Sequence, residues 1–167
     1  MNQRIMQQTF MRTKLLMTCL LFAVLAVSTA CDREDDLSLT GTSWKLYGYV
    51  DTSDNTVKIP SVPPDDEPRQ LAIRFSVEGK VMGYAISNEL LGDYRVLGDS
   101  IRIFPLARTK VGIPSGYEKV EEYFITSLVG HFKYEIRNGQ LRLYKNEGNE
   151  YMLFNKWGGS VSRYNLE

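Results

Sequence analysis

The sequence predicts a β-rich α+β domain, folded as a single antiparallel meander or partly closed, barrel-like sheet with one helix packed on it. Three observations predict this fold class. Apolar and polar residues alternate along most of the chain after residue 43, and a period of two is typical of half-buried strands. Short turn signals separate the alternating runs, which favours antiparallel neighbours. Residues 116–129 alone have apolar residues at helical spacing.

The first predicted strand covers residues 44–50. In this run Trp44 and every second residue after it are apolar or small, so Tyr47 and Tyr49 are expected on the face opposite Trp44. The strand ends at the stretch DTSDN, which is rich in turn formers and lacks the spacing of a calcium loop. Residues 59–68 hold four of the six prolines and three acids, so we expect a surface loop there.

Residues 71–77 and 81–85 predict a β-hairpin. Both runs alternate, and Gly79 lies between them at the turn. In the return strand Tyr84 is expected on the face opposite Val81, Gly83 and Ala85.

Three further turn signals divide the rest of the chain. They are Gly92-Asp93, Gly98-Asp99-Ser100 and Asn138-Gly139, and the last is the strongest short hairpin signal in the sequence. The strands expected around these turns cover residues 94–96, 101–103, 132–136, 141–143 and 151–154. The expected fold is therefore a meander that one helix interrupts.

The helix is predicted over residues 116–129. Ser115 followed by Glu118 has the spacing of a capping box, in which both side chains accept hydrogen bonds from otherwise unpaired backbone N–H groups. Acidic residues crowd the first turns, where the helix dipole favours anions, and Gly130 ends the helix. The stripe expected to face the sheet is Tyr117, Val120, Phe124 and Leu128.

Residues 1–30 have the composition of a secretory signal peptide. Three basic residues precede an uncharged run of 13 residues, LLMTCLLFAVLAV, which is shorter than the roughly 18 residues of a membrane-spanning helix. The small residues at positions 28–30 then lead directly to Cys31, which resembles the lipobox read by lipoprotein signal peptidase. Ser28 departs from that pattern, because the third residue before the cysteine is usually Leu.

Cleavage before Cys31 would divide the chain into four parts. We expect a lipoprotein signal peptide over residues 1–30, a lipidated Cys31 with an acidic tether over 31–38, a domain over 39–157 and a loose tail over 158–167. The acidic tether is similar to the stretch that follows the lipidated cysteine in surface-exported lipoproteins of Bacteroidetes. We therefore expect lipid anchoring in the outer membrane, at the periplasmic face or the cell surface. The sequence leaves open whether translation starts at Met1 or Met11.

The composition of the mature chain excludes several classes of function. Its 17 basic and 20 acidic residues give a net charge near −3, so it has no excess of cations for nucleic-acid phosphates. Cys19 leaves with the signal peptide and Cys31 is expected to carry lipid. The domain then has no thiol for a disulfide, a cysteine-bound metal or thiol catalysis.

Several short motifs follow one another in a fixed order along the chain. They are Leu39-x-Gly41-Thr42-x-Trp44, the run 71–75 with Gly83, Asn88 with Gly92-x-Tyr94, Thr109, Glu121-x-x-Phe124-x-x-x-Leu128, and the pairs Tyr134, Ile136 and Leu141, Leu143. In this order they resemble the META domain family (HslJ-like), which is common in bacterial envelope lipoproteins. The resemblance covers nearly the whole mature domain, about residues 39–154. It implies a fold more than a function, because members have no established enzymatic activity and are associated with envelope stress, secretion and drug tolerance.

This chain departs from the family pattern at three positions. Val111 and Ile113 stand where the family often has Met and Cys, and Ser87 stands where it commonly has Cys before the Asn. The resemblance therefore implies that any thiol or disulfide role of relatives is absent here.

The sequence contains no convergent set of catalytic or metal-binding residues, and we expect neither an enzyme nor a cofactor. His131 is the one histidine of the chain, and just past the helix it is expected to cap the helix dipole. Glu121 and Glu122 point about 100° apart on a helix, so we expect a solvated face and not a catalytic pair. The adjacent Asp65 and Asp66 are interpreted in the same way.

Three tyrosines form the candidate ligand or partner surface. Tyr47, Tyr49 and Tyr84 are expected to face outward, where aromatic rings can stack on sugars or on a protein, although cross-strand packing explains them without a ligand. We therefore predict a non-enzymatic domain for binding or envelope maintenance. Its expected partners are the membrane, through the lipid anchor, and an envelope protein or glycan, but not nucleic acid.

The sequence leaves other functions open. One is a surface lipoprotein that captures a carbohydrate or small apolar ligand for an uptake system. Another is a lipocalin-like binder, since Gly41-Thr42-Ser43-Trp44 is similar to the Gly-x-Trp opening of lipocalins; two residues instead of one separate its Gly from its Trp, which makes this alternative weaker. A third is an inhibitor that uses residues 59–68 as a protruding arm.

Overall fold

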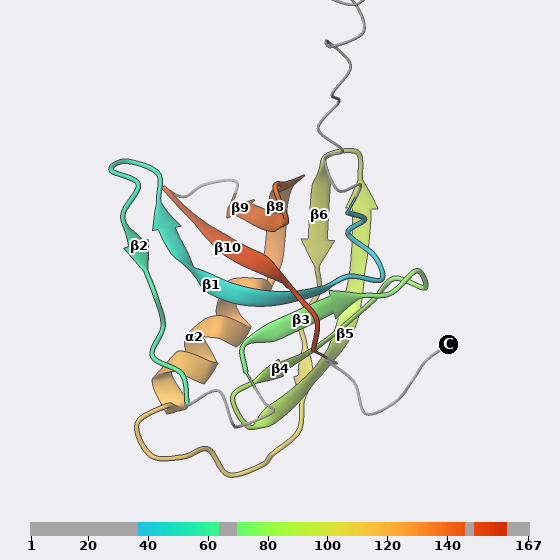
Figure 1. The fold of residues 1–167 in the computed structure, drawn as a ribbon. Coiled ribbons are helices and arrows are strands. Elements are labelled where there is room, and N and C mark those ends of the chain that lie inside the picture. Colours follow the sequence, from blue (N-terminus) through green and yellow to red (C-terminus); the bar gives the residue numbers. More distant parts are fainter. Residues whose placement is uncertain (1–36, 64–69, 146–148, 160–167) are drawn as a thin grey trace, which may run out of the picture. The chain divides into compact units, whose positions relative to one another are not determined.

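A computed structural model describes residues 37–63, 70–145 and 149–159 of the chain (Figure 1). The predicted signal peptide, Cys31 and most of the tether lie outside the described residues, as do Asp65 and Asp66. The elements are β1 (Ser43–Asp51), β2 (Val57–Lys58), β3 (Ala72–Phe75), β4 (Lys80–Ala85), β5 (Asn88–Leu97), β6 (Ser100–Ile103), β7 (Ala107–Arg108), α2 (Glu118–Leu128), β8 (Gly130–Arg137), β9 (Gln140–Lys145) and β10 (Glu150–Trp157).

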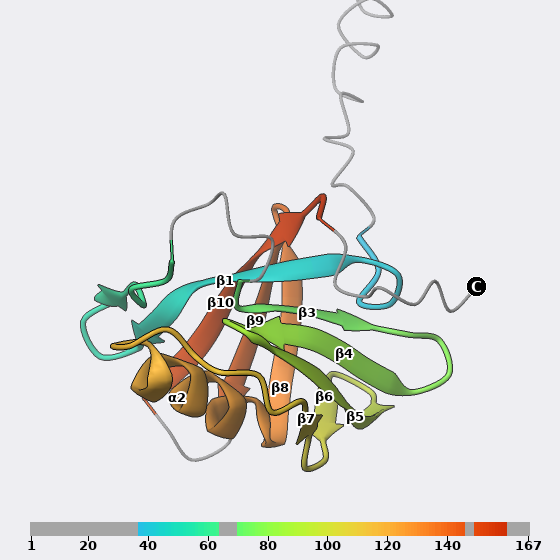
Figure 2. The same cartoon turned by 90° about the horizontal axis from the view of Figure 1, so that it is seen from below.

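The strands form one antiparallel sheet that closes into a barrel of eight strands. Around the barrel they follow the order β1-β3-β4-β5-β6-β8-β9-β10, and β10 pairs back to β1 along its whole length (Figure 2). The short strands β2 and β7 lie off this ring and pair with β1 and β5. The predicted β-rich, barrel-like sheet with one helix is therefore confirmed, and full closure satisfies the two edges that an open sheet would expose.

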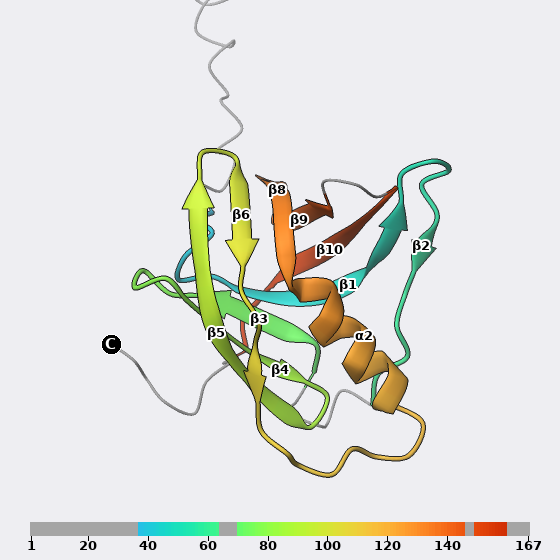
Figure 3. The same ribbon diagram turned by 180° about the vertical axis from the view of Figure 1, so that it is seen from behind.

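Helix α2 covers one end of this barrel (Figures 2 and 3). The helix follows β7 and leads directly into β8. In an antiparallel barrel the start of β8 lies at the same end as the end of β6, the β4–β5 turn and the start of β10. We call this the helix end. The opposite end holds the β3–β4 and β5–β6 turns and the start of β1, which the chain enters from Leu37. We call it the tether end.

Large aromatic side chains fill the barrel interior. Trp44, Phe75, Phe132 and Phe154 come from four different strands, and none is more than 1 % exposed. Complete burial of such a ring stabilises a fold by roughly 2–3 kcal/mol. At the tether end the indole N–H of Trp44 donates to the carbonyl oxygen of Leu39 at 3.3 Å, so the opening motif closes this end of the core.

The helix is shorter than predicted, and its capping box does not form. Tyr117 is the N-cap and its side chain makes no capping hydrogen bond. Instead the Glu118 carboxylate accepts a hydrogen bond from the backbone N–H of Gly116 at 2.9 Å. The physical reason is the left-handed backbone of Gly116, with φ of +95°, which delays the helix by two residues. Among the described residues no helix is long and apolar enough to cross a membrane.

The buried stripe of the helix is confirmed only in part. Phe124 and Leu128 are fully buried, whereas Tyr117 and Val120 are half-buried and pack on the edge of the core. The helix also buries Glu121, Ile125 and Ser127.

A β-bulge in β1 changes which side chains face the core. The register with β10 shifts between Leu46 and Gly48, so Tyr49 enters the same core cluster as Trp44. The prediction that Tyr49 lies on the face opposite Trp44 is therefore wrong, because one extra residue in a strand reverses the faces after it. Tyr47, at the bulge, is 43 % exposed.

The predicted turn at Gly92 is also wrong. Residues 88–97 form one continuous strand, and the chain turns earlier, at Ile86, which has a positive φ of 53°. The glycine is explained by close packing, since a Cβ there would lie 2.5 Å from the Leu106 side chain that crosses β5. A glycine in a strand can thus indicate a close approach as well as a turn.

The other turn predictions are confirmed. Asn138 and Gly139 have φ of 52° and 72°, the positive values that a type I′ hairpin requires, and Gly98 has φ of 63° between β5 and β6. The described part of the loop after Lys58 contains no further strand. The last strand is longer than predicted and reaches Trp157, because its second edge pairs with β1.

Candidate functional site

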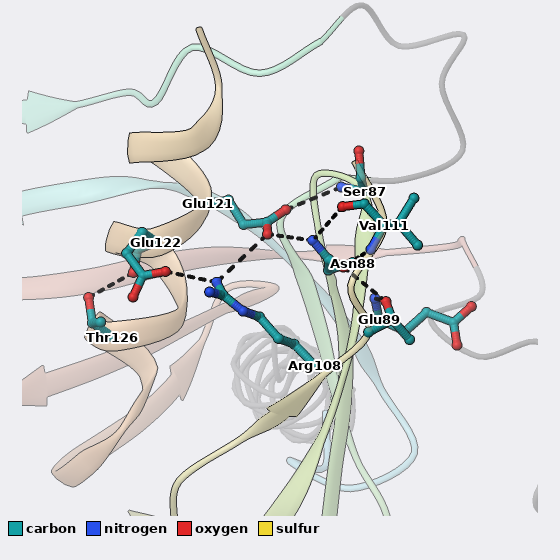
Figure 4. A network of polar contacts seen from close by, with 9 residues as sticks. Ser87, Asn88, Glu89, Arg108, Val111, Glu121, Glu122 and Thr126 are labelled. Atoms are coloured by element: carbon teal, nitrogen blue, oxygen red, sulfur yellow. Dashed lines mark hydrogen bonds and ion pairs between the residues drawn. The ribbon is translucent and has the colours of Figure 1, made fainter. Parts of the chain in front are cut away.

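A buried carboxylate lies at the helix end of the barrel. Glu121 of α2 is fully buried, and its Oε1 accepts a hydrogen bond from the Asn88 side-chain amide at 2.7 Å (Figure 4). Its Oε2 accepts one from the backbone N–H of Ser87 at 3.3 Å. The half-exposed Arg108 guanidinium lies 3.9 Å from the carboxylate. The carboxylate therefore joins the helix to the β4–β5 turn and to β7.

Asn88 extends this network to the segment before the helix. Its side-chain oxygen accepts hydrogen bonds from the Val111 N–H at 2.8 Å and from the Thr109 hydroxyl at 3.1 Å. The Thr109 hydroxyl in turn accepts one from the Glu89 N–H at 3.0 Å. These hydrogen bonds join the helix, the β4–β5 turn and the segment before the helix, so the network positions these parts of the chain relative to one another.

Glu121 and Glu122 differ in their surroundings. Glu122 is exposed and pairs with Arg108 at 2.8 Å, as expected for a solvated face. The same expectation is wrong for Glu121, because its helix position faces the β4–β5 turn, where Asn88 and Ser87 replace the water that burial removes.

A second feature at the helix end is a hollow of about 320 Å³. Residues from β1, β2, the chain just after β2, α2 and β10 line it: Tyr49, Lys58, Ile59, Pro60, Lys119, Val120, Tyr123 and Glu150. The rings of Tyr49 and Tyr123 meet edge to face, with centroids 4.8 Å apart and planes at 64°. We call it the Tyr49–Tyr123 hollow, and most of its surface is apolar.

Charged groups also line this hollow. The Tyr123 hydroxyl donates a hydrogen bond to Glu150 at 2.9 Å, and burial together with this bond raises the pKa of Tyr123. Lys58 and Lys119 bring two positive charges from opposite sides, one from β2 and one from α2. Two lysines and one glutamate line the hollow, so it combines apolar surface with a net charge of +1.

The Tyr49 hydroxyl is buried without a hydrogen-bond partner among the described residues. Ser127 lies close enough to lower its pKa slightly, but the two hydroxyls do not reach hydrogen-bonding geometry. Burial is the larger effect and raises the pKa of Tyr49 far above its usual range. The group therefore stays a neutral phenol.

Residues 37–157 match the family model of the META domain. The chain belongs to the META domain family. Three polar residues of the motifs above, Asn88, Thr109 and Glu121, are the ones that meet in the buried network. In this chain they hold the META fold together at the helix end. No curated protein matches the sequence.

Several solved structures are similar to this META domain, and the one with a TM-score above 0.5 shares its fold. An NMR structure of a protein from Burkholderia xenovorans is 20% identical, with 72% of this chain and 84% of that chain covered and a TM-score of 0.56. A crystal structure of a DUF4847 family protein from Bacteroides vulgatus is 18% identical, covering 70% and 93%, with a TM-score of 0.47. A lipocalin-like protein from Bacteroides uniformis is 20% identical, covering 71% and 98%, with a TM-score of 0.46.

The META fold separates the three tyrosines singled out in the sequence. Tyr47 is exposed at the bulge of β1, whereas Tyr49 is 4 % exposed beneath the helix. Tyr84 lies with Ala72 in a small buried cluster against Trp157, apart from the main core. Its position on the face opposite Val81, Gly83 and Ala85 is as expected, but the three rings form no common surface, and of the three Tyr49 alone lines the hollow.

The remaining candidates take no part in either feature. His131 is exposed in β8 opposite Arg102, two residues past the helix C-cap Val129. Asp51 and Asp54 accept hydrogen bonds from the N–H and hydroxyl of residues two positions later, Ser53 and Thr56, which confirms the predicted turn. These bonds lower the pKa of Asp51. Within the described ranges no group of three or more His, Cys, Asp or Glu side chains could hold a metal.

The sequence offered one local signal for the hollow. Lys119 and Tyr123 are four residues apart in the helix, so they share a face. Their partners Tyr49 and Glu150 come from β1 and β10, and only the closure of the barrel brings these strands to the helix.

Proposed function

We propose that this META domain is a non-enzymatic binding module, held to the outer membrane by a lipidated Cys31, and that it binds its partner at the Tyr49–Tyr123 hollow. The observation that carries the proposal is the composition of that hollow, an apolar aromatic surface flanked by Lys58 and Lys119. Such a surface suits a ligand or peptide with an apolar body and one anionic group. Envelope maintenance is the role that the family resemblance implies.

The barrel interior is the less suitable place for a ligand. A lipocalin-like binder needs an internal cavity, whereas here Trp44, Phe75, Phe132 and Phe154 fill the interior. Capture of a small apolar or carbohydrate ligand for uptake remains the alternative function, and it would use the same hollow, where the half-exposed ring of Tyr123 can stack on a sugar.

Binding can be tested by NMR on the mature chain. The probes are anilinonaphthalene sulfonate, an aromatic body with one anion, and a neutral maltose oligomer. We expect the sulfonate to shift the amide signals of Lys119, Val120 and Tyr123. A response to the sugar alone would instead favour carbohydrate capture. Shifts confined to residues outside the hollow, for either probe, would refute the proposed site.

A matched pair of variants sharpens the test. Tyr123 and Tyr47 have similar exposure, 47 % and 43 %, but only Tyr123 lines the hollow. Loss of one aromatic contact costs about 1–1.5 kcal/mol, so Tyr123→Ala should weaken sulfonate binding about tenfold, while Tyr47→Ala should leave it unchanged. Equal effects of the two substitutions would show that the probe binds elsewhere.

The lipid anchor is tested separately, by intact-mass spectrometry of the protein extracted from membranes. A mature species that begins at Cys31 and carries three acyl chains is the expected result. A water-soluble product that begins at Asp32 or later would contradict the anchor without affecting the binding site.

A further inference from the structure

The two most exposed large hydrophobic side chains of the described residues lie at one end of the barrel. Val77 is 80 % exposed in the β3–β4 turn, and Leu97 is 78 % exposed where β5 turns into β6. Both turns belong to the tether end. Hairpin tips normally carry polar residues or glycine, so a strongly exposed aliphatic side chain at each of two tips of the same end is unusual.

The two tips are held in place by hydrogen bonds between the hairpins. The Tyr94 hydroxyl of β5 donates to the carbonyl oxygen of Ser76 at 2.7 Å, and the Tyr94 N–H donates to that of Gly79 at 2.8 Å. Behind Leu97, the N–H of Tyr134 donates to the carbonyl oxygen of Asp99 at 2.9 Å. Val77 and Leu97 are therefore displayed on a fixed frame.

The charges beside the tips are largely neutralised within the protein. Lys80 pairs with Asp93 at 2.6 Å, and Lys133 pairs with Asp99 at 3.4 Å. Glu78 is a further carboxylate of the β3–β4 turn, where the Ser76 hydroxyl is hydrogen-bonded to it and lowers its pKa. Arg95 and Arg102 also lie on the β5–β6 hairpin, so the seven charged groups beside the tips sum to a net charge of +1. A charge this small suits a neutral surface better than a strongly cationic or anionic one.

The chain itself indicates which surface that is. Leu37 enters the barrel at the tether end, and together with Trp157 and Gly159 it lines a shallow depression there. Cys31 lies six residues before Leu37 in the sequence. Six extended residues span at most about 21 Å, so a lipid on Cys31 would hold this end of the barrel within that distance of the bilayer.

We propose that Val77 and Leu97 dock the tether end onto the bilayer that holds the Cys31 lipid, so that the Tyr49–Tyr123 hollow at the opposite end faces away from the membrane. The inference rests on the lipid anchor of the proposed function. One aliphatic side chain binds a membrane only weakly. The lipid anchor keeps both tips at a high effective concentration near the bilayer, so their weak contacts suffice to orient the domain. The docked orientation would present the hollow to partners away from the lipid.

The test uses single-cysteine variants of the lipidated protein in phosphatidylcholine vesicles. Because a thioether-linked Cys31 cannot react, each introduced cysteine is the single free thiol of the mature chain and takes one environment-sensitive nitrobenzoxadiazole label. The variants are Val77→Cys and Leu97→Cys at the tips. The matched control is Ile59→Cys, at another strongly exposed aliphatic residue (63 %), which lines the hollow.

Docking predicts a shift of label emission to shorter wavelength at positions 77 and 97, and quenching there by spin-labelled lipid. At position 59 no quenching by spin-labelled lipid is expected, even if the apolar hollow shifts the emission of the label there. If the lipid quenches the labels at 77 and 97 no more than the label at 59, the docking is refuted. Mass spectrometry of the same sample separates the two proposals: a sample without acyl chains overturns the anchor and the docking with it, whereas a lipidated sample with water-exposed tips overturns the docking alone.

Discussion

Replacing Asn88 by alanine removes the side chain that joins the buried Glu121 carboxylate to the chain before the helix. The amide nitrogen donates to Glu121 at 2.7 Å, and the amide oxygen accepts from Val111 and Thr109 at 2.8 and 3.1 Å. A hydrogen bond to a charged group contributes about 1.5–3 kcal/mol and a neutral one about 1 kcal/mol. Since the carboxylate stays buried with one donor fewer, we expect Asn88→Ala to lower the free energy of unfolding by about 3–4 kcal/mol.

The loss can be measured by urea unfolding, followed by circular dichroism and by tryptophan fluorescence. Asn155→Ala is a suitable control, because Asn155 is half-buried in β10 and its side chain accepts one neutral hydrogen bond, from Gln140 at 3.1 Å. Its expected cost is about 1 kcal/mol. A domain with about 5–15 kcal/mol of stability remains folded in either variant, so both can be compared. Equal losses for Asn88→Ala and Asn155→Ala would refute a special role for the buried network.

Two further predictions concern the barrel. A methyl group at Gly83 would collide with the Ala72 carbonyl oxygen of β3, so Gly83→Ala should lower the free energy of unfolding by about 3 kcal/mol. Gly112 lies in open space, so Gly112→Ala should change it by less than about 0.5 kcal/mol. Urea unfolding compares the two variants, and equal midpoints would contradict the close packing at Gly83. Burial raises the pKa of Tyr49 above its ordinary value of 10.0, so the stability linked to this proton is complete below pH 10 and falls as pH rises toward the raised pKa. Tyr49→Phe should therefore flatten the loss of stability above pH 10 without lowering stability at pH 7, because the hydroxyl has no hydrogen-bond partner; an unchanged pH profile would contradict this.

Local signals predicted the elements that depend on a few neighbouring residues. Asn138-Gly139 specifies its hairpin because both positions need a positive φ, and these residues tolerate it at low cost. The helix was predicted for a similar reason, from apolar residues repeated at its period. Its exact start was not, because the left-handed backbone of Gly116 overrides the capping signal of Ser115.

The predictions that were wrong concern residues whose surroundings depend on contacts far away in the sequence. The outward position predicted for Tyr49 assumed strict alternation, and a bulge forced by pairing with β10 reversed it. Glu121 was expected in solvent because a glutamate beside another glutamate usually is, but Asn88 and Ser87 lie 33 and 34 residues away in sequence and compensate its burial. Strands β2 and β7 have two residues each, too few for any period to be read.

For this protein, the sequence by itself determined the longer strands, most of the turns between them, the helix of the described residues and the motifs of the META domain, because each depends on backbone preferences and side-chain alternation within a few residues. The sequence also carries the prediction that Cys31 is lipidated, which rests on the order of basic, apolar and small residues before it and on their resemblance to a lipobox. Only the tertiary structure decided that β10 closes on β1, that the carboxylate of Glu121 is buried and that Tyr49 and Tyr123 share a hollow. Those features depend on contacts between residues far apart in the chain. Such contacts form, and stabilise the fold, only once the barrel has closed.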